Sequence, residues 1–323
     1  MKKRIIALLA AVAMLSVVIT GCGGSSDDKK ANDQAAEKKF FNIATGGTAG
    51  VYYPLGGTLA EIINKNIPGA NATAQSTGAS VANVNMLTQG SVQIAFIQND
   101  IAYYASTGTE MFQEKVDGLK CLATIYPETV QLVTIEKTGI KSVADLKGKK
   151  VAVGAAGSSV TGNSRHVLEA YGLTFEDINP QYLSFAEAAN GLKDGNIDAA
   201  FLVAGVPTAA VQDIAAQHKV VMIPIEDDKV EGMIKKYPFY TKVVIPADAY
   251  KQGADIATVG AKAMLVVSDK MDEQTAYDIT KAIFTNLDQL KAAHAVGQYI
   301  SKESAKDGVS IPMHPGAEKF YNE

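Results

Sequence analysis

Apolar runs of strand length alternate with amphipathic stretches of helical length along almost the whole chain from residue 40 onward. Strands that alternate with helices predict a parallel or mixed β-sheet with helices on both of its faces. The chain is long enough for two such units, so we expect two α/β lobes. The expected strands are residues 41–44, 72–76, 93–97, 119–125, 130–135, 149–153, 199–203, 220–223 and 261–267; the expected helices are residues 54–66, 81–87, 163–171, 185–192, 208–217 and 273–291.

The first residues predict export. Residues 2–4 are Lys-Lys-Arg, residues 5–18 are apolar, and Ile-Thr-Gly-Cys follows at 19–22. This order is typical of a secretory signal peptide with a lipoprotein cleavage site. We expect removal of residues 1–21, lipid on Cys22, and a flexible polar tether over residues 22–39 that holds the chain outside a bacterial cell membrane. A plain cleaved signal or an uncleaved anchor is the alternative, although the apolar run is shorter than a span of about 20 residues.

Charge and cysteine content exclude some classes of protein. The formal net charge is −4, and loss of Lys2, Lys3 and Arg4 with the signal peptide would make the chain more acidic still. Nucleic-acid binding requires a basic patch, so we expect no nucleic-acid partner. Cys121 is the only cysteine besides Cys22, so a lipidated chain would have no intramolecular disulfide and would depend on its packed core.

Two glycine-rich segments, residues 43–54 and 151–162, each follow an apolar strand and precede a helix. Such loops leave backbone N–H groups free at a helix N-terminus, where the helix dipole favours an anion. We therefore expect Thr48, Ser158, Ser159 and Thr161 to bind a carboxylate or phosphate. Alternatively, the glycines only tighten the turns. The second loop resembles a P-loop, but Asn163 stands where the phosphate-binding lysine is required.

Polar and aromatic residues at the other predicted strand ends complete the candidate binding site, because open α/β sheets bind ligands at this edge. Each has an ordinary alternative, such as helix capping for a serine or half-buried packing for a tyrosine. These candidates are Tyr52, Tyr53, Ser76, Ser80, Gln98, Asn99, Tyr126, Glu187, Gly205 and Pro207.

Charged residues could add to this site. An amino group on the ligand would need a carboxylate, and Asp100, Glu128 and Glu187 are the nearest candidates by location. Arg165 is the only arginine after the signal peptide and could clamp an acidic ligand, or it could pair with Glu169 one helical turn away.

Motifs for catalysis or metal binding are absent from the sequence. The four histidines are far apart, with no H-E-x-x-H spacing, and no Gly-x-Ser-x-Gly pentapeptide occurs. We therefore expect a binding protein that is not an enzyme and that uses no metal or cofactor. A site assembled in space from distant residues remains the alternative.

Several short segments together resemble the TAXI family of solute-binding proteins, the extracytoplasmic receptors of tripartite ATP-independent periplasmic (TRAP) transporters. They are residues 50–56 (Gly-Val-Tyr-Tyr-Pro-Leu-Gly), 76–83 (Ser-Thr-Gly-Ala-Ser-Val-Ala-Asn), 97–100, 126–128 (Tyr-Pro-Glu), 172–174, 182–188, 236–240 and 314–318. The second glycine loop departs from the Gly-Ser-Gly-Thr form of this family, since it has Gly-Ser-Ser-Val at 157–160.

The resemblance implies a two-lobed periplasmic-binding-protein fold (type II, Venus-flytrap) with two hinge-crossing segments. Lobe 1 would comprise residues 40–127 and 258–323, and lobe 2 residues 128–257. It implies a small ligand between the lobes, an amino acid such as glutamate or glutamine or another carboxylate, and delivery to an integral-membrane TRAP permease. An ATP-driven importer or an exported enzyme could use the same scaffold.

Overall fold

The computed structural model describes residues 38–323. The predicted signal peptide, the lipidation site at Cys22 and nearly all of the predicted tether lie outside these residues. The first strand, β1 (Lys39–Ala44), begins where the polar sequence gives way to Phe40 and Phe41.

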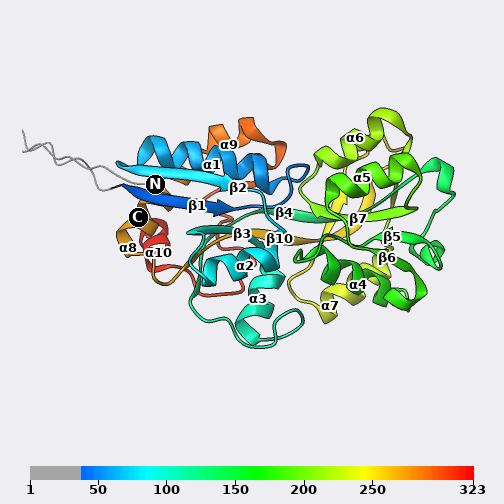
Figure 1. The fold of residues 1–323 in the computed structure, drawn as a ribbon, viewed down its shortest axis with the longest axis horizontal. Coiled ribbons are helices and arrows are strands. Elements are labelled where there is room, and N and C mark those ends of the chain that lie inside the picture. The colour runs from blue at the N-terminus through cyan, green and yellow to red at the C-terminus, as the bar shows by residue number, and fades with distance from the viewer. Residues whose placement is uncertain (1–37) are drawn as a thin grey trace, which may run out of the picture. The chain divides into compact units, whose positions relative to one another are not determined.

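One mixed β-sheet runs through the described residues (Figure 1). Its parallel strands come from strand–helix–strand units, and its antiparallel pairs all involve the two longest strands, β4 (Leu119–Ile135) and β10 (Ile256–Ser268). In sheet order the strands are β2 (Ala70–Gln75), β1, β3 (Ile94–Gln98), β10, β4, β7 (Ala199–Ala204), β5 (Lys150–Ala152) and β6 (Asn179–Gln181), with β8 (Val220–Ile223) beside β4 and β9 (Thr241–Ile245) beside β10.

Helices cover both faces of the sheet at each end (Figure 1). On the β1–β3 side, α1 and α9 lie across the sheet from α2 and α3, while on the β5–β7 side, α5 and α6 lie across it from α4 and α7. The helices are α1 (Tyr52–Asn66), α2 (Ser80–Thr88), α3 (Asn99–Thr107), α4 (Val160–Ala170), α5 (Phe185–Asp194), α6 (Ala209–Gln217), α7 (Asp227–Lys236), α8 (Glu273–Phe284), α9 (Leu287–Ala293) and α10 (Pro315–Tyr321). This arrangement confirms the predicted α/β class. None of the helices in residues 38–323 is long and apolar enough to cross a membrane.

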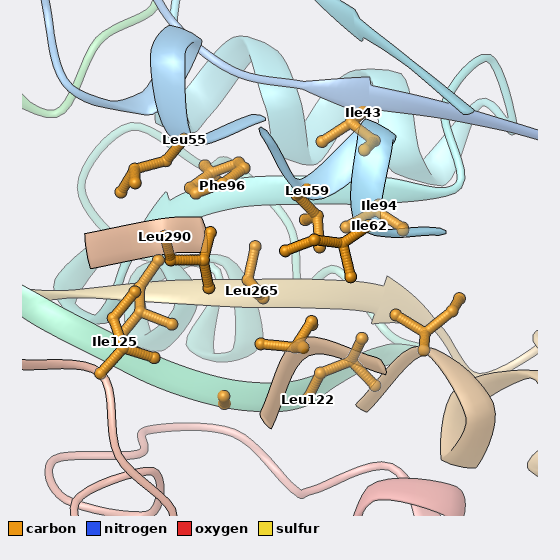
Figure 2. Packing of buried hydrophobic residues seen from close by; sticks show 14 of the residues in the cluster. Ile43, Leu55, Leu59, Ile62, Ile94, Phe96, Leu122, Ile125, Leu265 and Leu290 are labelled. Atoms are coloured by element: carbon orange, nitrogen blue, oxygen red, sulfur yellow. The ribbon is translucent and has the colours of Figure 1, made fainter. Parts of the chain in front are cut away.

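The core on the β1–β3 side forms where α1 packs on the sheet (Figure 2). Leu55, Leu59 and Ile62 recur at helical spacing and are at most 1% exposed. They meet Phe96 of β3 and Leu265 of β10, among other side chains of the same cluster. Burying each such side chain contributes about 1.5–3 kcal/mol, so this face holds α1, and the glycine loop before it, against the sheet.

Both long strands, β4 and β10, extend into both sides of the sheet. β4 pairs with β10 up to Thr129, and from Thr129 onward it pairs with β7 on its other edge. The prediction of two separate strands, 119–125 and 130–135, is wrong, because β4 continues through Pro127 between them. A register irregularity between Lys262 and Met264 lies beside the proline and accommodates its missing N–H donor. The proposed lobe boundaries at residues 127/128 and 257/258 stay a prediction.

Other differences from the predicted elements have local causes. The helix expected over residues 273–291 is two helices, α8 and α9, because side chains compete for the carbonyl groups at the break: the Thr285 hydroxyl donates to Lys281 O (2.7 Å) and the Asn286 amide to Ala282 O (2.8 Å). The sequence reading also missed α3, α7, α10, β6 and β9. Of these, α7 buries only Val230 and Met233, so its apolar pattern is weak.

Candidate functional site

A cavity of about 80 Å³ lies where the β1–β3 side meets the β5–β7 side. We call it the site cavity. Loops that lead into α1, α2, α4 and α5 form most of its wall, and β4 and β7 form the rest. Its lining residues are Gly46, Gly47, Gly50, Val51, Tyr52, Thr77, Gly78, Ala79, Ser80, Tyr126, Glu128, Ala155, Ser158, Ser159, Val160, Ser184, Phe185, Val203 and Ala204.

Helix N-termini direct backbone donors toward this cavity. The first N–H groups of α4, at Val160 and Thr161, have no hydrogen-bond acceptor within residues 38–323. The first N–H groups of α2 already have an acceptor in the protein, because Val81 N and Ala82 N both donate to Gly157 O, at 3.0 and 3.1 Å. The α4 end therefore offers the free donors to which an anion binds.

Glu128 is the one acidic residue of the cavity wall, and it is 3% exposed. The Gln98 amide donates to Oε2, and the Tyr126 hydroxyl donates to Oε1 at 3.2 Å. Burial raises the pKa of Glu128 to about 7, although these donors work in the opposite direction. No lysine, arginine or histidine lines the cavity, so Glu128 has no cationic partner there.

Aromatic rings surround this carboxylate. The rings of Tyr52 and Tyr126 meet edge to face with centroids 6.5 Å apart. The Tyr52 hydroxyl lies near Glu128 and Ser80, yet it is buried and makes no hydrogen bond of good geometry. Burial, and then the charge of Glu128, raise the pKa of Tyr52. An unsatisfied buried hydroxyl is costly, and a ligand in the cavity would supply its partner.

Six of the residues predicted from the sequence lie in the cavity wall, namely Tyr52, Ser80, Tyr126, Glu128, Ser158 and Ser159. Two more are buried close behind it: Gln98 holds Glu128, while Gly205 packs so tightly that a Cβ would meet Val296 Cγ1 at 2.4 Å and Tyr126 at 3.2 Å. Whether any of them binds a ligand stays a prediction.

The structure places the other predicted residues outside the wall, with other partners. Asn99 accepts from Lys262 N and donates to Gly308 O, both at 3.0 Å, so it joins the start of α3 to β10 and to the C-terminal segment. Thr48, Tyr53 and Ser76 are exposed. Thr161 is half-buried in α4, and Pro207 follows a cis peptide bond in a groove beside β9.

Three charged candidates are likewise held elsewhere. Glu187 completes a capping box with Ser184 at the start of α5 and faces solvent. Arg165 pairs with Glu110 at 2.8 Å instead of with the predicted Glu169. Asp100 is buried at the start of α3. Burial and ion pairing depend on the tertiary structure. The sequence therefore did not show that Glu128 lines the cavity while these three residues do not.

Phe185, Val203 and Ala204 are cavity-wall residues that the sequence reading did not propose as ligand-binding. It assigned Phe185 to a helix and Val203 to a strand, and it placed Ala204 in the segment just after that strand. Phe185 also lies against Gly50, where a Cβ would be 3.5 Å from its ring. The sequence did contain a signal for the position of Phe185. The capping motif Ser184-x-x-Glu187 marks the N-terminus of α5, which lies at this edge of the sheet.

A second buried polar cluster joins α3 to α4; we call it the α3–α4 cluster. The Asn163 amide donates to Asp100 Oδ2 at 3.0 Å and lies 2.8 Å from the Tyr240 hydroxyl, which is 2.9 Å from His166 Nδ1. Burial raises the pKa of Asp100 to about 7 and lowers that of His166 to about 4. Asn163 Oδ1, His166 Nε2 and the Tyr104 hydroxyl have no hydrogen-bond partner. Within residues 38–323, no three His, Cys, Asp or Glu side chains are grouped to hold a metal ion.

A family model matches residues 43–323, nearly the whole described chain. The chain belongs to the NMT1-like family. Membership corrects the identification as a TAXI receptor of a TRAP transporter, since the matching family is the NMT1-like one and the curated relative reported below is a sulfonate-binding protein. Four of the eight segments that carried the resemblance, residues 50–56, 76–83, 97–100 and 182–188, lie at strand-to-helix turns, which are features of the fold.

The curated relative is a putative aliphatic sulfonates-binding protein of Escherichia coli (strain K12), 42% identical over 73 residues, which is 23% of this chain and 23% of the relative. The aligned part is thus under a quarter of that protein's length. Solved structures that share the fold include a protein of Bordetella bronchiseptica RB50, with a TM-score of 0.55, 18% identity and coverage of 86% and 84% of the two chains.

Two further structures belong to the same comparison. PhnD1 from Prochlorococcus marinus (MIT 9301), in complex with methylphosphonate, has a TM-score of 0.55 at 10% identity and coverage of 81% and 91%. A putative L-cystine ABC transporter protein from Listeria monocytogenes has a TM-score of 0.50 at 17% identity and coverage of 83% and 98%. These likenesses confirm the fold of this NMT1-like chain as that of two-lobed periplasmic binding proteins.

Proposed function

We propose that this chain is an extracytoplasmic solute-binding receptor that encloses a small molecule in the site cavity and delivers it to the membrane permease of an ATP-driven importer. The carrying observation is the cavity itself, whose wall contains the buried, unsatisfied Tyr52 hydroxyl and Val160, the first residue of α4, whose N–H has no acceptor within residues 38–323. The relatives support the importer type, because they include a putative aliphatic sulfonates-binding protein and a putative L-cystine ABC transporter protein.

The location and ligand belong to the same proposal. Export with a lipid on Cys22 would keep the receptor beside its permease. The ligand is a small organic acid or amino acid, because the cavity offers helix N-terminal donors and room for only a small molecule. Closure would expel water from it and strengthen its hydrogen bonds.

Calorimetric titration of the mature protein tests the receptor function. The panel contains amino acids, sulfonates, phosphonates and dicarboxylates, and we expect one member to bind with a Kd below about 100 μM, roughly −5.5 kcal/mol. Absence of any such binder would count against a receptor. Recovery of the bound solute unchanged after incubation separates a receptor from an exported enzyme.

The importer type has its own test. We expect genes for an ATPase and a membrane permease beside the gene for this receptor, and we expect ligand-loaded receptor to stimulate that ATPase in proteoliposomes. Stimulation that is equal with and without ligand would contradict delivery by this route.

A further inference from the structure

We propose that the ligand is a zwitterion, with a cationic amine against Glu128 and an acidic group at the N-terminus of α4. This inference rests on the proposed receptor function and names the chemical class of its ligand. It assigns opposite roles to two parts of one cavity wall, β4 and the loop before α4.

The amine is inferred from a carboxylate that lacks a cation. Glu128 is 3% exposed, and the groups that approach it are neutral: the Gln98 amide and the Tyr126 and Tyr52 hydroxyls. Asp100, the nearest charged group that influences it, is itself acidic. Buried carboxylates are otherwise paired with a cation or protonated, because an isolated buried charge is expensive. A ligand ammonium is the cation that the protein does not provide.

The surrounding rings suit the same group. Tyr52 and Tyr126 present aromatic surface beside the carboxylate, and a cation is attracted to such faces when water is excluded. The unpartnered Tyr52 hydroxyl can accept a hydrogen bond from an ammonium, which carries three donors. An acidic ligand without a cation would leave the hydroxyl without this donor, and it would either meet the Glu128 carboxylate as a like charge or require Glu128 to bind a proton.

The acidic end of the ligand is assigned to α4. Within the described residues 38–323, Val160 N and Thr161 N have no acceptor. Ser159 lies in the wall beside Val160 at 3% exposure, and α4 has 11 residues, enough for its dipole to act. The cavity wall contains no lysine or arginine to neutralise a second acidic group. The structure therefore favours a ligand with balanced charges over a plain dianion.

Titration of matched ligand pairs tests this inference. Each pair differs in one amine: glutamate and glutarate, alanine and propionate, taurine and ethanesulfonate. We expect the amine-bearing member of the binding pair to bind at least about 100-fold more tightly, as truncation of a buried charge pair predicts. Glu128→Gln should reduce that preference to within about threefold, while near-ultraviolet circular dichroism shows that the variant is folded.

Glu136→Gln is the matched control, because Glu136 follows the same strand but pairs with Lys219 at the surface. It should keep the full preference for the amine. Equal or tighter binding of the amine-free members to the wild type would overturn the zwitterion inference and leave the receptor function standing, as would a preference that survives Glu128→Gln. If no member of any pair binds, the receptor function itself fails for these ligand classes, and the inference fails with it.

Discussion

Asp100 makes the free energy of unfolding depend on pH in a direction opposite to that of most carboxylates. Its side chain is 1% exposed, and burial raises its pKa to about 7 in the folded protein. In the unfolded chain an aspartate has a pKa of about 3.9. The folded state therefore binds the proton more tightly, and this contribution to stability is complete below about pH 4 and is lost as pH rises to about 7.

The magnitude follows from these two pKa values. Between pH 5 and pH 8 the deprotonation of Asp100 lowers the free energy of unfolding by about 2–3 kcal/mol. Asp100→Asn removes the titration but keeps a polar side chain, whose amide can donate to the unpartnered Asn163 Oδ1. The stability of the variant relative to the wild type should therefore improve by about 2–3 kcal/mol from pH 5 to pH 8.

Urea denaturation of ligand-free protein, followed by circular dichroism at several pH values, measures this difference. Asp145→Asn is the control, because hydrogen bonds from Lys141 N and the Ser142 side chain and N–H lower the pKa of this exposed carboxyl. Its stabilising effect is lost only as pH falls below the ordinary range, so its difference from the wild type should be flat between pH 5 and pH 8. A flat profile for Asp100→Asn as well would refute the reasoning.

Three further substitutions test the packing that positions the site cavity, each by urea denaturation. Gly56→Ala should destabilise the protein by about 1–3 kcal/mol, because its Cβ would lie 2.4 Å from Thr45 Cγ2. At Gly57, the next position of α1, an added Cβ would have no atom within 4 Å, so Gly57→Ala should raise the free energy of unfolding by about 0.5–1 kcal/mol. A loss of stability would contradict the open space and helical backbone described at this position. Asn83→Ala should lower the free energy of unfolding by about 1–3 kcal/mol, because the buried Asn83 amide donates to Thr45 O (2.6 Å) and Phe96 O (2.7 Å). An unchanged urea midpoint would mean that water takes the place of the amide as donor.

The sequence predicted best those parts of the cavity wall whose position depends only on where strands end and helices begin. The glycine loops before α1 and α4 lie at strand ends, and the rule that ligands bind at such ends located both. The rule has no information on which neighbouring side chain is buried. Asp100 lies just after β3, Glu128 lies within β4 and Glu187 lies in the first turn of α5, and only the folded structure shows that Glu128 lines the cavity while Glu187 caps a helix.

Elements with little apolar pattern were missed for a related reason. β9 is an edge strand whose Val244 is 50% exposed, so its residues do not alternate between core and solvent as a half-buried strand requires. α3 begins at Asn99 directly after β3 ends at Gln98, and no loop marks the change. Family identity was the largest error, since short segments shared with a fold do not define a family.

The sheet order has a consequence for synthesis. β3 and β4 are not neighbours, because β10 lies between them and pairs with both. About 120 residues separate the end of β4 at Ile135 from the start of β10 at Ile256. At roughly 5–20 residues per second, translation leaves the edge of β4 that faces β10 unpaired for roughly 6 to 24 seconds, and the edge of β3, which ends earlier at Gln98, unpaired for longer. A nascent chain of this topology therefore depends on protection of those edges, because the strand that closes the middle of the sheet is the last one to be made.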